Sequence, residues 1–271
     1  MKIKLLTVLL MAILIVTGFS GCIEEEPGPE VREYFEDEYS VNDVTILNII
    51  TVNGAIYVTT WDNENIFLNA TKRSRYGQDD LDKAEIRVTE DNNEITIEIK
   101  HDLPIRSRAV DLDIKIPNNV NLKSATSTNG PIEITNTNGD SILKTTNGPI
   151  LAEGIDGYIK ASTTNGGIEV KDTTGVDDLI STNGGITAEI FDIRENIDIL
   201  TTNGGITVYI NPNINASIEI ETVNGDISGN TSFISITEST FNSLKGTIGA
   251  GGDKIDIETT NGGIKLYKLE M

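Results

Sequence analysis

The sequence contains very few of the residues that most often carry out chemistry in proteins. Among its 271 residues are one cysteine, one histidine and one tryptophan, and aromatic residues make up 5% of the chain. A single cysteine excludes an intramolecular disulfide. A single histidine excludes metal sites built from several histidines and leaves little basis for a Ser-His-Asp triad. We therefore expect this histidine, His101, to be an ordinary side chain at the end of a strand.

Basic residues are scarce as well. Lysine and arginine number 21 against 42 aspartates and glutamates, so the formal net charge is −21. Removal of residues 1–21, which contain Lys2 and Lys4 but no acid, changes this charge to −23 (−21 − 2). Such a charge argues against nucleic acid as a partner and against electrostatic adhesion to anionic lipid, because both require a cationic face. We interpret the acidic excess as a determinant of solubility.

The N-terminus has the pattern of an export signal. Lys2 and Lys4 precede an apolar run from Leu5 to Val16, which is shorter than the ~20 residues that span a bilayer. The following Phe19-Ser20-Gly21-Cys22 resembles the lipobox of prokaryotic lipoproteins, with Phe in place of the usual Leu. We predict that residues 1–21 are a signal peptide and that Cys22 is lipidated, which accounts for the lone cysteine. The lipid membrane is then a partner through Cys22, at the outer face of the cytoplasmic membrane.

Two regions follow the predicted cleavage site. Residues 22–43 hold the acidic runs Glu24-Glu25-Glu26 and Glu36-Asp37-Glu38, whose self-repulsion predicts an extended, unpacked tether. From Val44 onward, apolar and polar residues alternate, as in Ile95-Thr96-Ile97-Glu98-Ile99, and this pattern is typical of half-buried strands. Residues 44–271 are therefore predicted to form one all-β domain.

The predicted domain repeats one turn motif, Thr-Asn-Gly or Val-Asn-Gly. Its asparagines are 18 residues apart from Asn147 to Asn165 and from Asn165 to Asn183, and the last interval, from Asn224 to Asn261, is 37 residues, close to two further periods. A fixed period of this size indicates a repeat architecture. The nine asparagines of the motif are Asn53, Asn129, Asn138, Asn147, Asn165, Asn183, Asn203, Asn224 and Asn261.

Two architectures are compatible with this repeat. Asn-Gly between alternating segments is a strong hairpin signal and would give an antiparallel meander, although the single sheet would be larger than open sheets usually grow. The alternative is a parallel β-solenoid with about 18 to 20 residues per coil, in which stacked asparagines form a hydrogen-bonded ladder. The solenoid explains why the motif recurs so literally. Its structural turn and ladder residues would be Asn129, Asn147, Asn165, Asn183, Asn203, Asn224 and Asn261. Lys265 and Lys268, on the last strand, would then protect the exposed end of the stack against strand addition.

The order of motifs resembles a known family of β-helix domains, the "putative adhesins". The resemblance rests on Asp111–Pro117 followed by Leu122–Ile134, and on the tail from Leu244 to Leu266, and it covers about Val44 to Lys268. It implies a right-handed single-stranded β-helix in an exported protein of lipoprotein type. The activity of the family is undefined, so the resemblance bears on fold much more than on function.

No residue set in the sequence demands catalysis. The carboxylate pairs Asp79-Asp80 and Asp177-Asp178 lack the spacing of a calcium loop, and we expect no metal and no cofactor. We predict a non-catalytic, adhesin-like or envelope-associated module that binds a glycan or a surface protein through the flat polar face of its sheet. The alternatives are a polysaccharide lyase or hydrolase built on a β-helix and using carboxylates, and a purely structural spacer at the cell surface.

Overall fold

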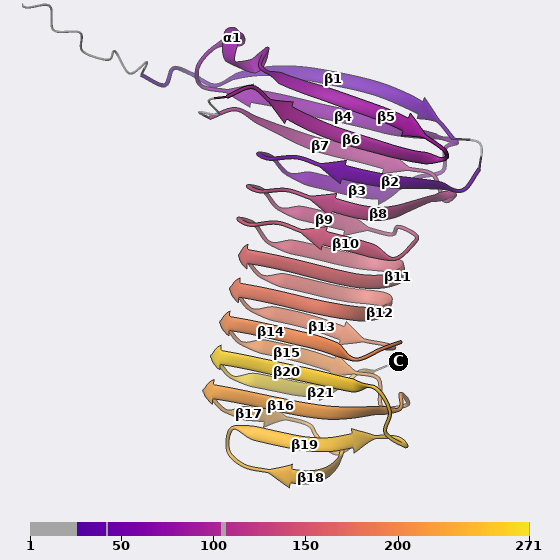
Figure 1. The fold of residues 1–271 in the computed structure, drawn as a ribbon, viewed down its shortest axis with the longest axis vertical. Helices are drawn as coiled ribbons and strands as arrows, with labels where there is room; N and C mark the ends of the chain where they lie inside the picture. The colour runs from indigo at the N-terminus through magenta and orange to yellow at the C-terminus, as the bar shows by residue number, and fades with distance from the viewer. Residues whose placement is uncertain (1–25, 42, 104–106, 271) are drawn as a thin grey trace, which may run out of the picture.

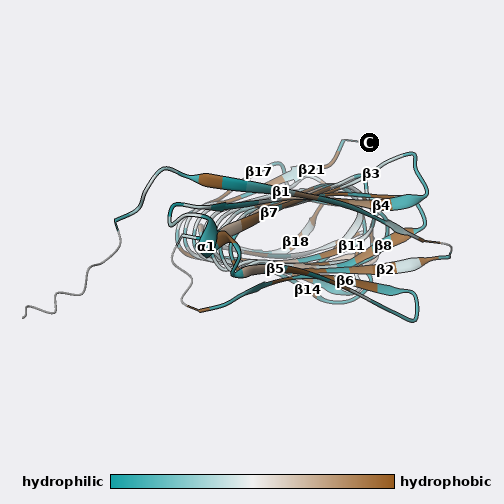
Figure 2. Cartoon of the chain, turned by 90° about the horizontal axis from the view of Figure 1, so that it is seen from above, coloured by the Kyte–Doolittle hydropathy of each residue, from teal (hydrophilic) through white to brown (hydrophobic). Residues whose placement is uncertain are grey.

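The protein is an elongated stack of β-strands arranged in two facing layers (Figures 1 and 2). The computed structural model describes residues 26–41, 43–103 and 107–270. Over these residues the strands form one 21-stranded sheet, and the only helix is the single turn α1, Gln78–Leu81. The sheet is continuous because the two long strands, β11 (Ile150–Asn165) and β12 (Ile168–Asn183), each run through both layers.

Strand formation follows from the alternation of side chains. In β14 (Ile197–Asn203), Ile197 and Ile199 are buried while Asp198 between them is exposed. The buried side chains of both layers face each other and form one core, composed mainly of isoleucine, leucine and valine. Isoleucine and valine favour strands because their branched side chains pack well on a pleated surface.

The two layers are named here by their position relative to the Asn-Gly turns. Strands that end at these turns, together with the neighbours that extend them, form the pre-turn layer. The pre-turn layer contains β2 (Thr45–Ile50), β5 (Ala84–Asp91), β6 (Glu94–His101), β8 (Val120–Thr126), β10 (Ser141–Lys144), β14, β16 (Ala216–Asn224), β18 (Ser235–Ser239), β19 (Ser243–Ile248), β20 (Lys254–Asn261) and the second halves of β11 and β12. The post-turn layer contains β1 (Val31–Ser40), β3 (Ile56–Thr60), β4 (Asn65–Ser74), β7 (Ala109–Ile116), β9 (Ile132–Thr135), β13 (Ile186–Ile190), β15 (Ile206–Ile210), β17 (Ile227–Gly229), β21 (Ile264–Lys268) and the first halves of β11 and β12.

Most neighbouring strands are parallel, and their register places like residues on like. Ile150 pairs with Ile132 on one side and with Ile168 on the other, and Ile168 pairs in turn with Ile186. Antiparallel pairs occur towards the two ends of the stack: β1 with β4, β4 with β7 and β5 with β6 near the N-terminal end, and β16 with β19 and β19 with β18 at the other. The antiparallel meander predicted as an alternative is therefore wrong for the Asn-Gly turns, because they connect parallel coils.

The turns themselves pack so closely that they admit only glycine after asparagine. A hydroxyl group from each coil closes the turn of the preceding coil, as when Thr163 Oγ1 donates to the Gly148 carbonyl at 3.0 Å and Ser181 Oγ donates to the Gly166 carbonyl at 2.9 Å. A Cβ added to Gly166 would lie 2.0 Å from the carbonyl oxygen of Gly148. The literal repetition of the motif follows from this close stacking of backbone on backbone.

We expect Gly166→Ala to lower the free energy of unfolding much more than Gly167→Ala. The added Cβ at Gly166 would overlap backbone, whereas at Gly167 the nearest atom is the Gly185 carbonyl oxygen at 3.3 Å. The first variant must separate two coils, and overpacking typically costs about 1–3 kcal/mol. Urea unfolding of the two variants measures the difference, and equal losses of stability would contradict the explanation of the repeat given above.

The order of coils in space differs from their order in the sequence at both ends of the stack. Near the N-terminus, β2 and β3 lie between the β6–β7 coil and the β8–β9 coil. Near the C-terminus, β20 and β21 lie between the β14–β15 coil and the β16–β17 coil. The last coil of the chain is thus an interior coil of the stack (Figure 1).

This order corrects two predictions. Lys265 and Lys268 do not protect an exposed end, because β21 pairs with β15, and its N-terminal part also pairs with β17. Asn261 does not follow Asn224 by two further periods along the stack but lies between Asn203 and Asn224. The spacing of 37 residues contains the antiparallel strands β18 and β19 instead of another coil of the ladder.

The predicted acidic tether, residues 22–43, is also wrong in part. Its segment Val31–Ser40 is strand β1, which pairs antiparallel with β4 over its whole length. Basic residues of β4 lie opposite the acids: Lys72 Nζ donates to Glu33 Oε1 at 2.9 Å. Phe35 and Tyr39 also pack against the core. Charge pairing and apolar contact together offset the self-repulsion on which the prediction was based.

Candidate functional site

A concave polar surface lies at the edge of the stack opposite the Asn-Gly turns. Two hollows, of about 550 Å³ and about 380 Å³, adjoin there and share Val41 in their lining. We call them together the loop-edge recess. Its walls are three connections: residues 61–64 between β3 and β4, residues 117–119 between β7 and β8, and the turn between β5 and β6.

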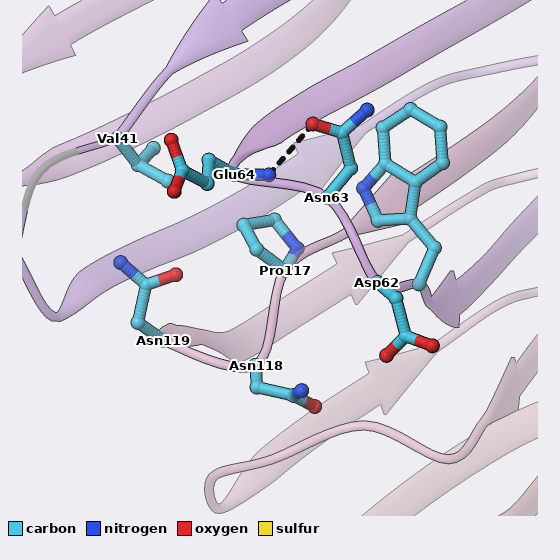
Figure 3. A pocket seen from close by; sticks show the side chains of 8 residues that line it. Val41, Asp62, Asn63, Glu64, Pro117, Asn118 and Asn119 are labelled. Atoms are coloured by element: carbon cyan, nitrogen blue, oxygen red, sulfur yellow. Dashed lines mark hydrogen bonds between the residues drawn. The ribbon is translucent and has the colours of Figure 1, made fainter.

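The larger hollow is shaped by two loops, the first of which is hydrogen-bonded to the strand that leads into the second. Trp61 donates its backbone N–H to the Ile116 carbonyl at 3.0 Å, and Val120 N–H closes the other loop on the Pro117 carbonyl at 3.0 Å. The loops become neighbours because β3 and β7 pair in parallel and end at the same edge. In Figure 3 the side chains spread around Pro117, with Glu64 and Asn119 towards Val41 and Asp62 away from it.

Trp61, the single tryptophan, is held in a defined orientation. Its indole Nε1 donates to the Asn65 carbonyl at 2.9 Å, and its ring packs against Phe67 with the ring centroids 5.8 Å apart. Lys115 Nζ lies 5.8 Å from the centroid of the indole, within the range of a cation–π contact. Trp61 is therefore a rigid, half-buried wall of the hollow.

The smaller hollow is joined to the larger one through Asn119 and Asp43. Asn119 Nδ2 donates to the Asp43 carbonyl at 3.1 Å, and Thr45 N–H donates to the Asn119 carbonyl at 3.0 Å. Across the hollow, the β5–β6 turn places Asn92 and Asn93 in the left-handed region, with φ of 46° and 63°. Asparagine tolerates this conformation better than most residues, which explains why two of them form the turn.

The lining of the recess is acidic and amide-rich. Among the described residues, neither lysine nor arginine lines either hollow. The hydrogen bond from Asn48 and the contact with Lys123 lower the pKa of Glu94, so its carboxylate is charged. Such a surface can accept and donate many hydrogen bonds but repels anions. The acidic and amide side chains that line the two hollows are Asp43, Asp62, Asn63, Glu64, Glu90, Asp91, Asn92, Asn93, Glu94, Asn118 and Asn119.

A second aromatic feature lies on the outer surface of the post-turn layer. The rings of Tyr209 and Tyr267 stack with their centroids 5.3 Å apart and their planes at 23°. Together with Lys268 and Glu270 they line a hollow of about 430 Å³. This hollow differs from the recess because it contains a basic side chain.

The predicted ladder asparagines lie together on the turn edge, and Asn53 joins them. Each side-chain amide donates from Nδ2 to Oδ1 of the preceding rung at 2.6–2.9 Å, and the chain of bonds ends where Asn53 donates to the Arg108 carbonyl. Asn138 lies at the opposite edge, where it donates to the Asn118 carbonyl. The rungs in spatial order are Asn53, Asn129, Asn147, Asn165, Asn183, Asn203, Asn261 and Asn224.

The carboxylate pairs considered for calcium are engaged elsewhere. Asp80 is ion-paired with Arg108 at 2.7 Å, Asp177 with Arg194 at 2.8 Å, and Asp178 with Lys160 at 2.5 Å. Within residues 26–41, 43–103 and 107–270, no group of three or more His, Cys, Asp and Glu side chains is arranged to hold a metal ion.

His101 lies at the end of β6, as expected, but it is part of a buried cluster. Arg108 Nε donates to its Nδ1 at 3.2 Å, while its Nε2 is buried without a hydrogen-bond partner in the described part of the chain. Burial, and then the positive charge of Arg108, lower the pKa of His101 below its ordinary value of 6.5. The imidazole is neutral in the folded protein at neutral pH.

We expect the protein to lose stability as the pH falls below 6.5, the ordinary pKa of His101. The pKa is lower in the folded than in the unfolded chain, so acid favours the unfolded chain. The stabilisation is complete above 6.5 and is lost as the pH falls towards the folded-state pKa. Urea unfolding across this window measures the slope. His101→Gln should flatten it, and an unchanged slope in that variant would assign the effect to other groups.

The recess has no sequence motif of its own. Trp61 is distinctive only as the single tryptophan, and the acids and amides around it carry no repeated motif. The signal that was available is the polar segment Trp61-Asp62-Asn63-Glu64 between two apolar strands, together with Pro117-Asn118-Asn119 after a third. Cys22, predicted to be lipidated, and the predicted signal peptide, residues 1–21, lie outside the described residues. In the portion that is described, no helix has the length and apolar character needed to cross a membrane.

Comparison with known proteins gives a family match over most of the chain. The family model described as Toastrack DUF4097 matches residues 38–267. Among curated proteins, none matches this chain. Solved structures that resemble it include a "putative cell adhesion protein" from Clostridium sporogenes, which is 13% identical, with a TM-score of 0.35 and coverage of 88% of this chain and 100% of that one.

Two further solved structures resemble the chain with similar identity, TM-score and coverage. A "putative adhesin" from Bacteroides fragilis is 15% identical, with a TM-score of 0.42 and coverage of 86% of this chain and 97% of the other. A "putative lipid binding protein" from Parabacteroides distasonis is 10% identical, with a TM-score of 0.28 and coverage of 88% and 97%.

Proposed function

The chain belongs to the Toastrack DUF4097 family, and from this premise we propose that it is a non-catalytic binding module of the cell surface whose ligand is a glycan. The observation that carries the proposal is the loop-edge recess. Its two hollows, of about 550 Å³ and about 380 Å³, are within the usual size range of small-molecule sites. Amide and carboxylate side chains beside a fixed indole match the hydroxyl groups and apolar ring faces of a sugar.

The charge of the recess selects among glycans. Carboxylates line both hollows, and the described lining contains no lysine or arginine, so neutral or amine-bearing sugars are favoured and sulfated or carboxylated ones are repelled. The recess thus replaces the flat outer face of the sheet as the proposed binding surface. The flat face offers side chains in one plane, whereas a recess surrounds its ligand and excludes more water.

The module is anchored to the membrane by lipid. We propose that residues 1–21 are removed as a signal peptide and that Cys22 carries the lipid, on the basis of the lipobox-like Phe19-Ser20-Gly21-Cys22. Two acyl chains suffice for stable anchoring where one is marginal. Strand β1 begins at Val31, so the folded stack starts only a short segment after the lipid.

The finer architecture belongs to the same proposal. We propose a right-handed single-stranded β-helix with about 18 to 20 residues per coil. Support for the coil length comes from the register, in which Ile168 pairs with Ile186, and Ile186 with Ile206, at separations of 18 and 20 residues.

A glycan array tests the ligand class. The soluble chain from Ile23 to Met271 is applied to neutral, amine-bearing and sulfated glycans, and retention of neutral or amine-bearing glycans is expected. Trp61→Ala should weaken binding about tenfold, since loss of one aromatic contact is equivalent to about that factor. Trp61→Phe should retain part of the affinity because it keeps an apolar ring.

The matched control is the other aromatic hollow. Changing Tyr209 and Tyr267 to alanine leaves the recess intact and should leave binding unchanged. Loss of binding in this variant but not in Trp61→Ala would place the site at the tyrosines. Release of shortened oligosaccharide from any bound glycan would overturn the non-catalytic assignment, and retention of none would leave a structural spacer as the function.

The anchor is tested separately in the native host. Cys22→Ser should move the protein from the membrane fraction to the medium or leave it as an unprocessed precursor. A variant that is processed and stays membrane-bound like the unaltered protein would show that another segment holds it there.

A further inference from the structure

The nine Asn-Gly sequences carry a chemical liability that the fold controls. The backbone nitrogen of the residue after asparagine can attack the side-chain Cγ, and glycine permits this best because it has no side chain to obstruct the approach. The new N–Cγ bond forms as the Cγ–Nδ2 bond breaks, and the amide leaves as ammonia. Water then opens the cyclic imide to aspartate or isoaspartate. Water is the only co-reactant.

Two restraints oppose this reaction at the interior rungs of the ladder. First, the side-chain amide is held from both sides: Asn165 donates to Asn147 at 2.7 Å and accepts from Asn183 at 2.9 Å. Second, the N–H of the next glycine, which supplies the attacking nitrogen, is bound to the next coil, as when Gly166 donates to the Asn183 carbonyl at 3.1 Å. The same glycine bond is made by Gly54, Gly130, Gly148, Gly184 and Gly204.

Asn224 is the last rung, so its side-chain amide is held from one side only and the N–H of the next glycine is not bound within the described chain. Its amide donates to Asn261 Oδ1 at 2.9 Å, but its own Oδ1 accepts from no described residue. The next strand, β19, adds no rung to the ladder in the described chain, and the N–H of Gly225 has no partner among the residues that the structure places. Asn224 is also exposed, so water reaches it.

Two other sites lack one restraint each. Asn261 is held from both sides in the ladder, but Gly262 N–H has no described partner. Asn138 lies outside the ladder and accepts no bond on Oδ1 in the described chain, while Gly139 N–H is bound to the Asp156 carbonyl at 3.0 Å. The nine sites therefore fall into three groups according to how many of the two restraints they have.

We propose that Asn224 is a modification site, at which the folded protein deamidates spontaneously through a cyclic imide with Gly225. The product exchanges an amide for a carboxylate, so the donor to Asn261 Oδ1 is lost. A negative charge also appears at an end of the ladder near Glu221 and Asp226 in the sequence. Ageing of the protein thus removes the last hydrogen bond of the ladder and leaves the remaining rungs intact.

The test is peptide mapping by mass spectrometry of the folded full-length chain during incubation at mildly alkaline pH. Asn224 should deamidate about tenfold faster than Asn147, Asn165 or Asn183, because breaking one hydrogen bond that restrains the reaction slows it by up to about that factor. Asn138 and Asn261 should have intermediate rates. The same chain in urea should deamidate at all nine sites at similar rates, since every site has the same Asn-Gly sequence.

Matched variants complete the test. Asn224→Gln should remove the fast product, because the longer side chain cyclises poorly, whereas Asn138→Gln should leave it unchanged. A folded protein in which interior rungs react as fast as Asn224, or in which Asn224 is as stable as they are, would overturn the proposal.

Discussion

A chain that ends at Asp253 is expected to lose its cooperative fold instead of forming a stack that is one coil shorter. The deleted segment contains β20 and β21, which lie between the β14–β15 and β16–β17 coils. It contributes four fully buried side chains, Ile255, Ile257, Ile264 and Leu266. Burial of each side chain stabilises the fold by about 1.5–3 kcal/mol, or about 6–12 kcal/mol for the four together. This sum is comparable with the whole free energy of unfolding of a typical domain.

Circular dichroism during thermal unfolding measures this result. The truncated chain should lose its sharp transition, whereas the full chain with Lys265→Ala and Lys268→Ala should keep it, because those side chains are exposed on the same coil. A truncated chain that unfolds cooperatively, with a denaturant dependence reduced only in proportion to its length, would show that the flanking coils can close the gap.

Asp80→Ala is expected to lower the free energy of unfolding by about 3–5 kcal/mol, the usual result of leaving one partner of a buried ion pair unpaired. The side chains of Arg108 and Asp80 are 0% and 5% exposed, and the Ser74 hydroxyl donates to the same carboxylate at 2.6 Å. Arg108 also donates to the backbone carbonyls of Asp80 and Asp102, so it connects α1 to the end of β6.

Urea unfolding should rank three variants. Asp80→Ala is the most damaging, and the double change Asp80→Leu with Arg108→Met should recover much of the loss, because no charge is then left unpaired. Arg32→Ala, which removes the exposed pair of Arg32 with Glu30, should change stability by no more than about 1 kcal/mol. A double variant less stable than Asp80→Ala alone would contradict this account.

The repeated part of the fold could be predicted from the sequence because its signal is local. Between Asn129 and Asn203, coils that are consecutive in the chain are also adjacent in the stack, so the period of the asparagines gives the register directly. The insertion of β20 and β21 could not be predicted in this way. One Asn-Gly turn fits against any other, and the motif therefore carries no information about which coil is its neighbour.

The recess and strand β1 could not be predicted from the sequence, because both form through contacts with residues that are distant in the chain. Trp61 and Pro117 line one hollow only because β3 and β7 pair, and that pairing exists because the β6–β7 coil is stacked outside β2 and β3. Strand β1 has an acidic sequence that by itself predicts repulsion. Its stability comes from Lys72 of β4, which lies opposite Glu33 and forms an ion pair with it, and from the packing of Phe35 and Tyr39 against the core.

The inserted C-terminal coil also sets a limit on when the protein can fold during its synthesis. A ribosome makes β20 and β21 after β14–β17, yet they fill an interior position between these earlier coils. The β16–β19 segment can therefore reach its final place only after β20 and β21 have been made. Until then the gap between the β14–β15 and β16–β17 coils is unfilled, and the coils on either side of it lack the neighbour that their strand edges pair with.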